Sequence, residues 1–149
     1  MLTLGQNEEA CVSALLEFLE GEGLPGHGLT IDEILASSND QLERDHQFIQ
    51  WVFPNRQPSR FNWSAPVLTE AEIEGICQSG VAAVYLRRAL ARMRKFYSET
   101  DAWMAPKDHN HLRITRILEA AALLLGIDEA RRFLHFVEER VSNGETPVS

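Results

Sequence analysis

The sequence contains little of what marks membrane, secreted or disulfide-rich proteins. Its longest uninterrupted apolar run covers eight residues, 120–127, whereas a membrane-spanning helix needs roughly 20. The two cysteines, Cys11 and Cys77, lie far apart and show no metal-binding or redox spacing. The first ten residues, MLTLGQNEEA, have neither the basic start nor the apolar core of a secretory signal. We therefore expect a soluble cytoplasmic chain without a transmembrane segment, in which both cysteines are reduced and buried as small hydrophobic side chains.

Lysine is also scarce, since it occurs only at positions 95 and 107, and arginine carries most of the positive charge. The chain has 22 acidic and 14 basic side chains, which gives a formal net charge of −8. Acidic residues dominate positions 1–80, whereas bases slightly outnumber acids over 81–149. A net negative charge repels phosphate backbones, so nucleic acid is not an expected partner. Arginine suits planar pairing with carboxylates, and we expect much of the basic charge to pair within the protein.

No stretch alternates apolar and polar residues with the two-residue period of a half-buried strand. The run VAAVYL at 81–86 could pass for a strand, but it continues into arginines at helical spacing. With 149 residues and 44% hydrophobic side chains, the chain has the size and composition of one domain. We predict a single all-α domain over 1–149, a bundle of five to six helices. The expected helices cover 8–20, 39–53, 70–79, 81–98, 109–126 and 128–144, with a short turn at 30–36 and a flexible tail at 142–149.

Capping signals support these boundaries. A capping box, in which a Ser or Thr is followed three residues later by Glu or Gln, occurs at three expected helix starts. The pairs are Thr30 with Glu33, Ser38 with Gln41 and Thr69 with Glu72. Gly21 and Gly126 follow the ends of two expected helices, where glycine is the preferred residue. The side chains expected to face the core are Leu15 and Phe18 in the first helix, Leu86, Leu90, Met93 and Tyr97 in the fourth, and Phe133, Leu134, Val137 and Val141 in the last.

Residues 54–68, PNRQPSRFNWSAPVL, do not fit the helical scheme, because they contain three prolines and no periodicity. Connections of about 15 residues without secondary structure are uncommon in compact domains and are often functional. We expect a long proline-rich crossover loop whose aromatic and aliphatic side chains fold back onto the helices. Arg56, Arg60 and Asn62 would then be its exposed polar members.

A polar pair interrupts the apolar stripe of the expected helix 39–53. Asp45 and His46 lie one turn after Leu42, so at least one of them should reach the edge of the core, where a carboxylate needs a partner. Arg113 and Arg116 share a face of the helix at 109–126 and can supply one. We predict that Asp45 forms a structural ion pair with Arg113 or Arg116 and holds the two helices in register.

Three histidines could act together. His109 and His111 begin an expected helix, and with His46 they offer imidazole ligands of the kind that bind zinc. Positions i and i+2 of a helix point in different directions, however, and no zinc-enzyme spacing such as H-E-x-x-H occurs. We therefore expect capping and hydrogen-bonding roles for these histidines, with no metal and no cofactor.

Nucleophilic and nucleotide-dependent catalysis lack sequence support. The chain contains no G-x-S-x-G elbow, no P-loop and no G-x-G-x-x-G after a strand. We expect a protein that is not an enzyme. The alternative is an enzyme of unassigned reaction, such as a metal-assisted hydrolase, that uses Asp45, His46, His109 and His111.

The expected helix at 81–98 carries five basic residues and no acid before Glu99. Such a surface can bind anions, RNA or an acidic partner. The simpler interpretation is that the preceding helix packs antiparallel beside it, so that Glu70, Glu72 and Glu74 neutralise part of the charge.

Three segments together resemble the conserved N-terminal domain of the opioid growth factor receptor family. They are LERDHQFIQWVFPN at 42–55, FNWSAPVLT at 61–69 followed by Glu72 and Ile73, and HNHLRITRILE at 109–119. The resemblance extends over roughly 40–145. It implies an α-helical domain and a receptor for an opioid pentapeptide that restrains cell growth from the nucleus. The additional regions of the animal members, a nuclear-localisation signal and C-terminal repeats, have no counterpart within these 149 residues.

We therefore interpret the chain as a non-catalytic module that binds a peptide, a small molecule or a protein. Aromatic anchors beside a few fixed polar groups are the usual composition of a binding pocket. The expected binding residues are His46, Gln50, Trp51, Arg56, Asn62, Trp63, His109, His111 and Arg113. The sequence does not specify the ligand or the oligomeric state.

Overall fold

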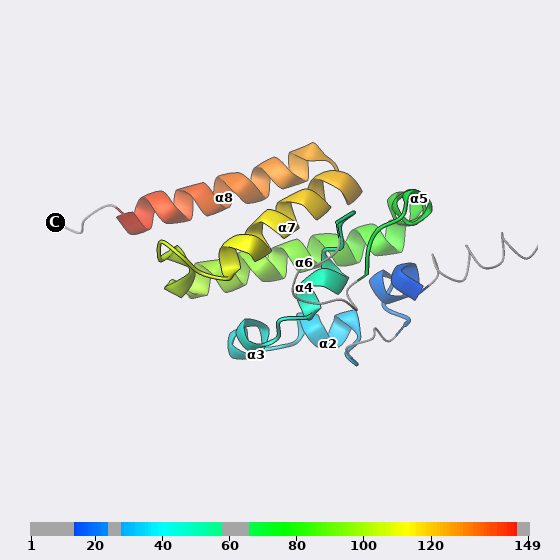
Figure 1. The fold of residues 1–149 in the computed structure, drawn as a ribbon, viewed down its shortest axis with the longest axis horizontal. Coiled ribbons are helices and arrows are strands. Elements are labelled where there is room, and N and C mark those ends of the chain that lie inside the picture. The colour runs from blue at the N-terminus through cyan, green and yellow to red at the C-terminus, as the bar shows by residue number, and fades with distance from the viewer. Residues whose placement is uncertain (1–13, 24–27, 58–65, 146–149) are drawn as a thin grey trace, which may run out of the picture.

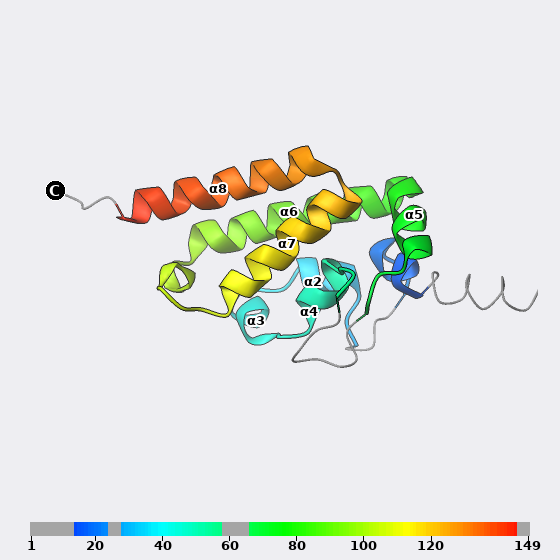
Figure 2. The ribbon, with the colours of Figure 1, turned by 45° about the horizontal axis from the view of Figure 1, so that its top comes forward.

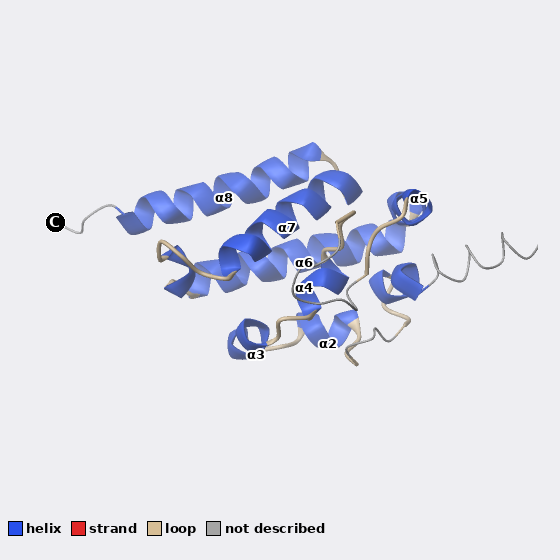
Figure 3. Ribbon diagram, in the orientation of Figure 1, coloured by secondary structure: helices blue, strands red, loops and turns tan. Residues whose placement is uncertain are grey.

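The computed structural model describes residues 14–23, 28–57 and 66–145, and these are helical with short connections (Figure 1, Figure 3). A first helical segment occupies 14–19. The elements that follow are α2 (Ile31–Leu35), α3 (Asn39–Arg44), α4 (Phe48–Val52), α5 (Glu70–Gln78), α6 (Gly80–Glu99), the 3-10 turn η1 (Ala102–Met104), α7 (Asn110–Leu124) and α8 (Ile127–Glu145). Within these ranges the extended backbone is limited to an isolated bridge between Asn55 and Val67. The all-α prediction is therefore confirmed.

The long helix α6 runs through the middle of the domain (Figure 1, Figure 2). Helix α8 lies along it in the same direction, because Arg87 faces Glu129 near the start of both helices and Arg140 binds the Tyr97 carbonyl near their ends. Helix α7 packs against both, and the short helices α2, α3 and α4 cover the side of α6 away from α8. The N-terminal end of α7 thereby comes close to α3 and to the C-terminal end of α6.

The helical stripes define the core largely as the sequence predicts. The four side chains expected to face inward from α6 are buried, as are Leu15 and Phe18 of the first helix. On α8, Phe133 and Val137 are buried, whereas Leu134 is 40% exposed. The prediction for Leu134 was wrong because it lies one residue, about 100°, beyond Phe133 around the helix.

All three predicted capping boxes are present. In each, the side chain of the Ser or Thr accepts from the N–H of the third helical residue, and the Glu or Gln side chain accepts from the main chain of the cap. Gly126 ends α7 with a φ of +110°, and its N–H donates to the Ala121 carbonyl at 3.0 Å. The helix boundaries that rest on local signals are thus confirmed.

The single helix predicted over 39–53 is divided into α3 and α4. Asp45 leaves the helical conformation, with φ −82° and ψ 107°. Its carboxylate accepts hydrogen bonds from the main-chain N–H groups of Gln47 at 2.8 Å and Phe48 at 3.1 Å. A short acidic side chain that caps following N–H groups competes with helix continuation, so the break occurs where the polar pair interrupts the stripe.

Helix α5 lies across the N-terminal end of α6, so the antiparallel pairing predicted for them was wrong (Figure 2). Among the described residues, the bases of α6 pair elsewhere: Arg88 with Asp32 at 3.7 Å, and Arg87 with Glu129 at 4.0 Å. Arg92 donates to the Ser37 carbonyl at 2.9 Å. The charge is partly neutralised within the fold, but by α2 and α8 instead of α5.

Cys77 is exposed, contrary to the prediction, with its sulfur 3.6 Å from the Leu123 carbonyl. Cys11 lies outside the described residues.

The two ends of the 54–68 loop meet, because the Leu68 N–H donates to the Asn55 carbonyl at 2.9 Å. No helix in the described ranges is long and apolar enough to cross a membrane.

Candidate functional site

Arg113 connects α7 to the end of α3. Its side chain is only 5% exposed, and its guanidinium donates to the carbonyls of Leu42 at 2.9 Å and Asp45 at 2.8 Å. A weaker bond reaches the Glu43 carbonyl at 3.4 Å. The last carbonyls of a helix lack partners within the helix, and a planar donor fork can satisfy several of them. Arg113 therefore closes the C-terminal end of α3.

Arg116, one turn later on α7, does the same for α4. Its Nε donates to the Phe53 carbonyl at 2.9 Å, directly after the last residue of α4. The predicted ion pair is thus corrected: among the described contacts, Arg113 binds the Asp45 main chain, and the Asp45 carboxylate caps α4. Helix α7 is still held in register with α3 and α4, but by hydrogen bonds from its arginines to main-chain carbonyls.

Burial lowers the pKa of both arginines, and neighbouring carboxylates oppose that effect. The ordinary pKa of arginine is so high that both remain cations. The Arg113 guanidinium is directed at main-chain carbonyl groups inside the protein, which assigns it a structural contact, and its predicted binding role stays a prediction.

A cluster of polar side chains forms where α3 meets the start of α7. His109 Nε2 lies 3.1 Å from Glu43 Oε1, and His109 Nδ1 lies 3.8 Å from Asp108 Oδ1. The buried amide of Asn110 donates to both carboxylates, to Glu43 at 3.1 Å and to Asp108 at 2.9 Å. The buried Tyr97 hydroxyl donates to the side-chain oxygen Oδ1 of Asn110 at 3.1 Å.

Asp108 is held as an anion in this cluster. Burial raises the pKa of its carboxyl, but hydrogen bonds from the Asn110 main chain and side chain, together with His109 and His111, lower it further than burial raises it. The pKa of Asp108 therefore lies below its ordinary value. Burial, with smaller contributions from the Glu43 and Asp108 carboxylates, raises the pKa of Tyr97 strongly against the opposing effect of Arg113, so its hydroxyl stays protonated and acts as a donor.

Of the three histidines, the structure brings two together. The rings of His46 and His109 lie edge to face, with centroids 5.6 Å apart. His111 points elsewhere, because its Nε2 lies 2.6 Å from the Trp103 carbonyl. A carbonyl can only accept, so Nε2 of His111 carries the proton. The expected divergence of positions 109 and 111 is confirmed.

The other described members of the predicted binding patch have separate local contacts. Gln50 is buried, Trp51 packs edge to face on Phe18 at 5.6 Å, and Arg56 pairs with Glu70 at 3.1 Å. The predicted members Asn62 and Trp63 lie outside the described residues.

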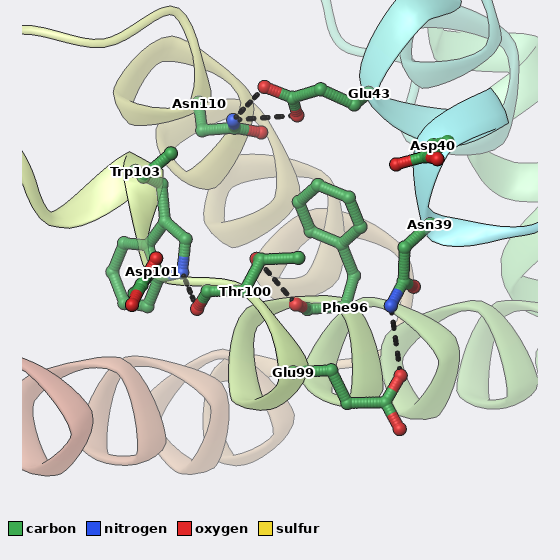
Figure 4. Close-up of a pocket in the computed structure, with 10 residues that line it drawn as sticks. Asn39, Asp40, Glu43, Phe96, Glu99, Thr100, Asp101, Trp103 and Asn110 are labelled. Atoms are coloured by element: carbon green, nitrogen blue, oxygen red, sulfur yellow. Dashed lines mark hydrogen bonds between the residues drawn. The ribbon is translucent and has the colours of Figure 1, made fainter.

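A cavity of about 360 Å³ lies instead between α3, the end of α6, η1 and the start of α7 (Figure 4). Four carboxylates, two aromatic rings and several neutral polar groups line it, and none of the described lining residues is basic. Its lining consists of Asn39, Asp40, Glu43, Phe96, Glu99, Thr100, Asp101, Ala102, Trp103 and Asn110.

Local hydrogen bonds fix the walls of this cavity. The Trp103 indole donates to the Thr100 carbonyl at 2.9 Å, and the Thr100 hydroxyl donates to the Phe96 carbonyl at 2.7 Å. Across the cavity, the Asn39 amide donates to Glu99 at 2.9 Å (Figure 4). Asp40 and Asp101 are exposed and make no such bond within the described part of the chain.

Sequence reasoning did not select this cavity. The signal available in the sequence was the pair of acidic residues Glu99 and Asp101, which flank Thr100 at the end of a predicted helix. The approach of residues 39–43 to residues 96–110 depends on how the helices pack, and no local pattern states it.

Comparison with known proteins identifies the family. A family model described as "Opioid growth factor receptor (OGFr) conserved region" matches residues 10–102, more than half of the chain. The chain belongs to the opioid growth factor receptor family. The match begins well before the 40–145 region expected from the sequence and ends before the motif at 109–119.

Curated relatives agree with this assignment. The opioid growth factor receptor of Mus musculus is 33% identical over 144 residues, covering 81% of this chain and 22% of that protein. The Homo sapiens receptor is 32% identical over 147 residues, covering 81% of this chain and 21% of its own. Opioid growth factor receptor-like protein 1 of Xenopus tropicalis is 31% identical over 113 residues, or 62% of this chain and 22% of that protein. The chain thus spans about a fifth of these relatives, and no solved structure matches it.

Proposed function

We propose that this domain is a non-catalytic binding module and that the acidic cavity receives a cationic organic ligand, such as the ammonium group of a peptide or an amine. The observation that carries this proposal is the lining: four carboxylates surround a hollow with two aromatic rings and no described basic residue. Opposite charges attract more strongly in a partly enclosed site than in open water. A volume of about 360 Å³ lies in the range of small-molecule pockets.

The relatives support a receptor role. They are named receptors for an opioid growth factor, and the family resemblance implies a peptide ligand. A peptide carries a free ammonium at its N-terminus, which is the kind of group this lining favours. The aromatic rings of Phe96 and Trp103 offer apolar contact for the part of the ligand next to that charge.

The geometry favours binding over the alternative enzyme. Of the four residues that an enzyme would use, Asp45 caps α4 and His111 binds the Trp103 carbonyl. A nucleophile or a general base needs its partner within hydrogen-bond reach and aimed at a shared reacting position. The hydrogen bonds described above for the Asp45 carboxylate and for His111 Nε2 are with main-chain groups, and among the described residues only His46 and His109 of the four have their rings together.

A thermal-shift titration with paired probes tests the proposal. Phenethylamine carries an ammonium beside an aromatic ring, and N-acetylphenethylamine keeps the ring but removes the charge. A ligand at 100 times its Kd adds about 2.7 kcal/mol of stability. We expect phenethylamine to raise the Tm by several degrees at saturation and the acetylated probe to leave it unchanged.

Asp101→Asn supplies the matched variant, because the Asp101 side chain caps nothing and its replacement removes only charge. We expect it to weaken phenethylamine binding about fivefold, in keeping with about 1 kcal/mol for one partly exposed charge. Glu138→Gln, on the exposed face of α8, should have no effect. Equal shifts with both probes, or equal losses in the two variants, would refute a cation site here.

A further inference from the structure

We propose that Glu43, Asp108 and His109 bind one divalent transition-metal ion of the Zn²⁺ class at the rim of the cavity. One ligand atom from each of the three residues can be chosen so that all lie within 4.8 Å of one another. This inference goes beyond the proposed ligand site, because it concerns a different occupant and needs no organic ligand.

The ligand atoms lie near, but not yet at, the separations found around a bound ion. Zinc binds imidazole nitrogen and carboxylate oxygen at about 2.0–2.2 Å, which places neighbouring ligand atoms of a tetrahedral site roughly 3.3–3.6 Å apart. His109 Nε2 lies 3.1 Å from Glu43 Oε1, whereas the 3.8 Å contact to Asp108 is made by the other ring nitrogen, Nδ1. A single ion uses only one of these nitrogens, and three ligand atoms chosen in this way lie within 4.8 Å of one another, so the side chains would close by about 1 Å around the ion. The side chains of His109 and Glu43 are 43% and 36% exposed, so both have room to adjust around an ion.

The two carboxylates are positioned by a buried polar pair. The Asn110 amide donates to Glu43 and Asp108, and the Tyr97 hydroxyl donates to that amide. Asn110 and Tyr97 are 1% and 0% exposed. Hydrogen-bonded groups behind metal ligands orient them in this way and are worth 10- to 100-fold in affinity.

The charges around the cluster leave room for a cation. Two carboxylates converge there, and among the described residues the arginine paired with Glu43 is Arg113, whose Nη1 lies 4.0 Å away while its hydrogen bonds go to main-chain carbonyls. One imidazole with two carboxylates suits zinc and its neighbours better than Ca²⁺ or Mg²⁺, which prefer oxygen ligands alone.

His46 supplies a candidate fourth ligand. Its ring lies edge to face with His109, at a centroid distance of 5.6 Å, and the residue is exposed. A rotation of its side chain can bring a ring nitrogen toward the cluster. Where His46 stays in its present position, water completes the coordination, as in zinc sites with three protein ligands.

Calorimetric titration of the tag-free, chelator-treated full chain with Zn²⁺ tests the proposal. We expect one ion per chain, and a loss of at least tenfold in affinity for His109→Ala and for Glu43→Gln. His135→Ala is the matched control, because His135 pairs with Glu139 at 3.7 Å on the exposed side of α8 and offers an ordinary histidine–carboxylate pair. It should leave the affinity unchanged.

Co²⁺ provides a second readout that does not depend on the variants folding. Bound Co²⁺ should give visible absorption bands and broaden the NMR signals of residues 43, 46 and 108–110 in the wild-type chain. The proposal is overturned by the absence of binding at 1:1 stoichiometry, by equal weakening in His135→Ala, or by broadening centred away from these residues. These titrations contain no amine, so a negative result would not bear on the proposed ligand of the acidic cavity, which the thermal-shift experiment tests separately.

Discussion

Replacing Arg113 by methionine should destabilise the domain, because it removes the group that closes the end of α3. The guanidinium makes two short hydrogen bonds to helix carbonyls, at 2.9 and 2.8 Å, and its side chain is 5% exposed. Hydrogen bonds to a charged group contribute about 1.5–3 kcal/mol each, and a buried acceptor left without a donor adds a cost. Removing the desolvated charge recovers part of this, so we expect a net loss of about 3 kcal/mol.

Urea unfolding followed by circular dichroism at 222 nm measures this loss. In thermal unfolding of a chain of this length, the same loss should lower the Tm by roughly 6–12 °C. Arg113→Lys should recover only part of the stability, since one ammonium cannot span the same carbonyls. Arg132→Met is the control, because Arg132 is 65% exposed and pairs only with Glu129 on its own helix among the described contacts. If Arg113→Met costs less than about 1 kcal/mol, like an exposed pair, then α7 does not hold α3 as described.

Three further predictions test the local structure. Asp45→Ala should cost about 1 kcal/mol in urea unfolding through loss of the α4 cap, whereas Asp45→Asn, which keeps an acceptor oxygen, should cost less. Gly21→Ala should lower the free energy of unfolding by about 2 kcal/mol, because φ is +84° and the new Cβ would lie 2.6 Å from the Tyr85 hydroxyl. Gly80→Ala is the control and should be neutral in the same assay, since the space at its Cβ is open. Equal losses in the two variants would contradict this prediction. The pKa of Asp108 lies below its ordinary 3.8, so its carboxylate stabilises the fold above that pH and the contribution disappears as pH falls through the folded value. Asp108→Asn should therefore be less stable than wild type near pH 6 and equal to it in strong acid, and a constant difference across the range would exclude this linkage.

The elements that local chemistry specifies were predictable. The capping boxes at Thr30, Ser38 and Thr69 each involve residues three positions apart, so the sequence alone contains both partners. The stripe on α6 likewise follows from helical period and was found buried.

The break between α3 and α4 shows where local reasoning stops. Asp45 was recognised as a polar residue in an apolar stripe, but two outcomes fit that observation: an ion pair across helices or a cap that ends one of them. In the structure the Asp45 carboxylate accepts hydrogen bonds from the nearby N–H groups of Gln47 and Phe48. Arg113 donates to the main-chain carbonyl of Asp45, which the break leaves without a helical partner. Which outcome prevails depends on the approach of α7, which is a tertiary property.

The candidate site was predicted only in part for the same reason. His46 and His109 were both selected and their rings are in contact, and His109 approaches Glu43, which lines the cavity. Asp40, Glu99 and Asp101 were not selected, because separately they look like exposed charges at helix ends. Their common position arises from packing α3 against the end of α6, which brings together residues some 60 positions apart.

The central claim is that the acidic cavity binds a cation, and an NMR titration of the isotopically labelled chain with phenethylamine tests it most directly. The account predicts saturable amide shifts in residues 39–43, 99–103 and 110, with one site per chain and no such shifts from the acetylated probe. Shifts that N-acetylphenethylamine reproduces, or that centre on α5 or the outer face of α8, would contradict it.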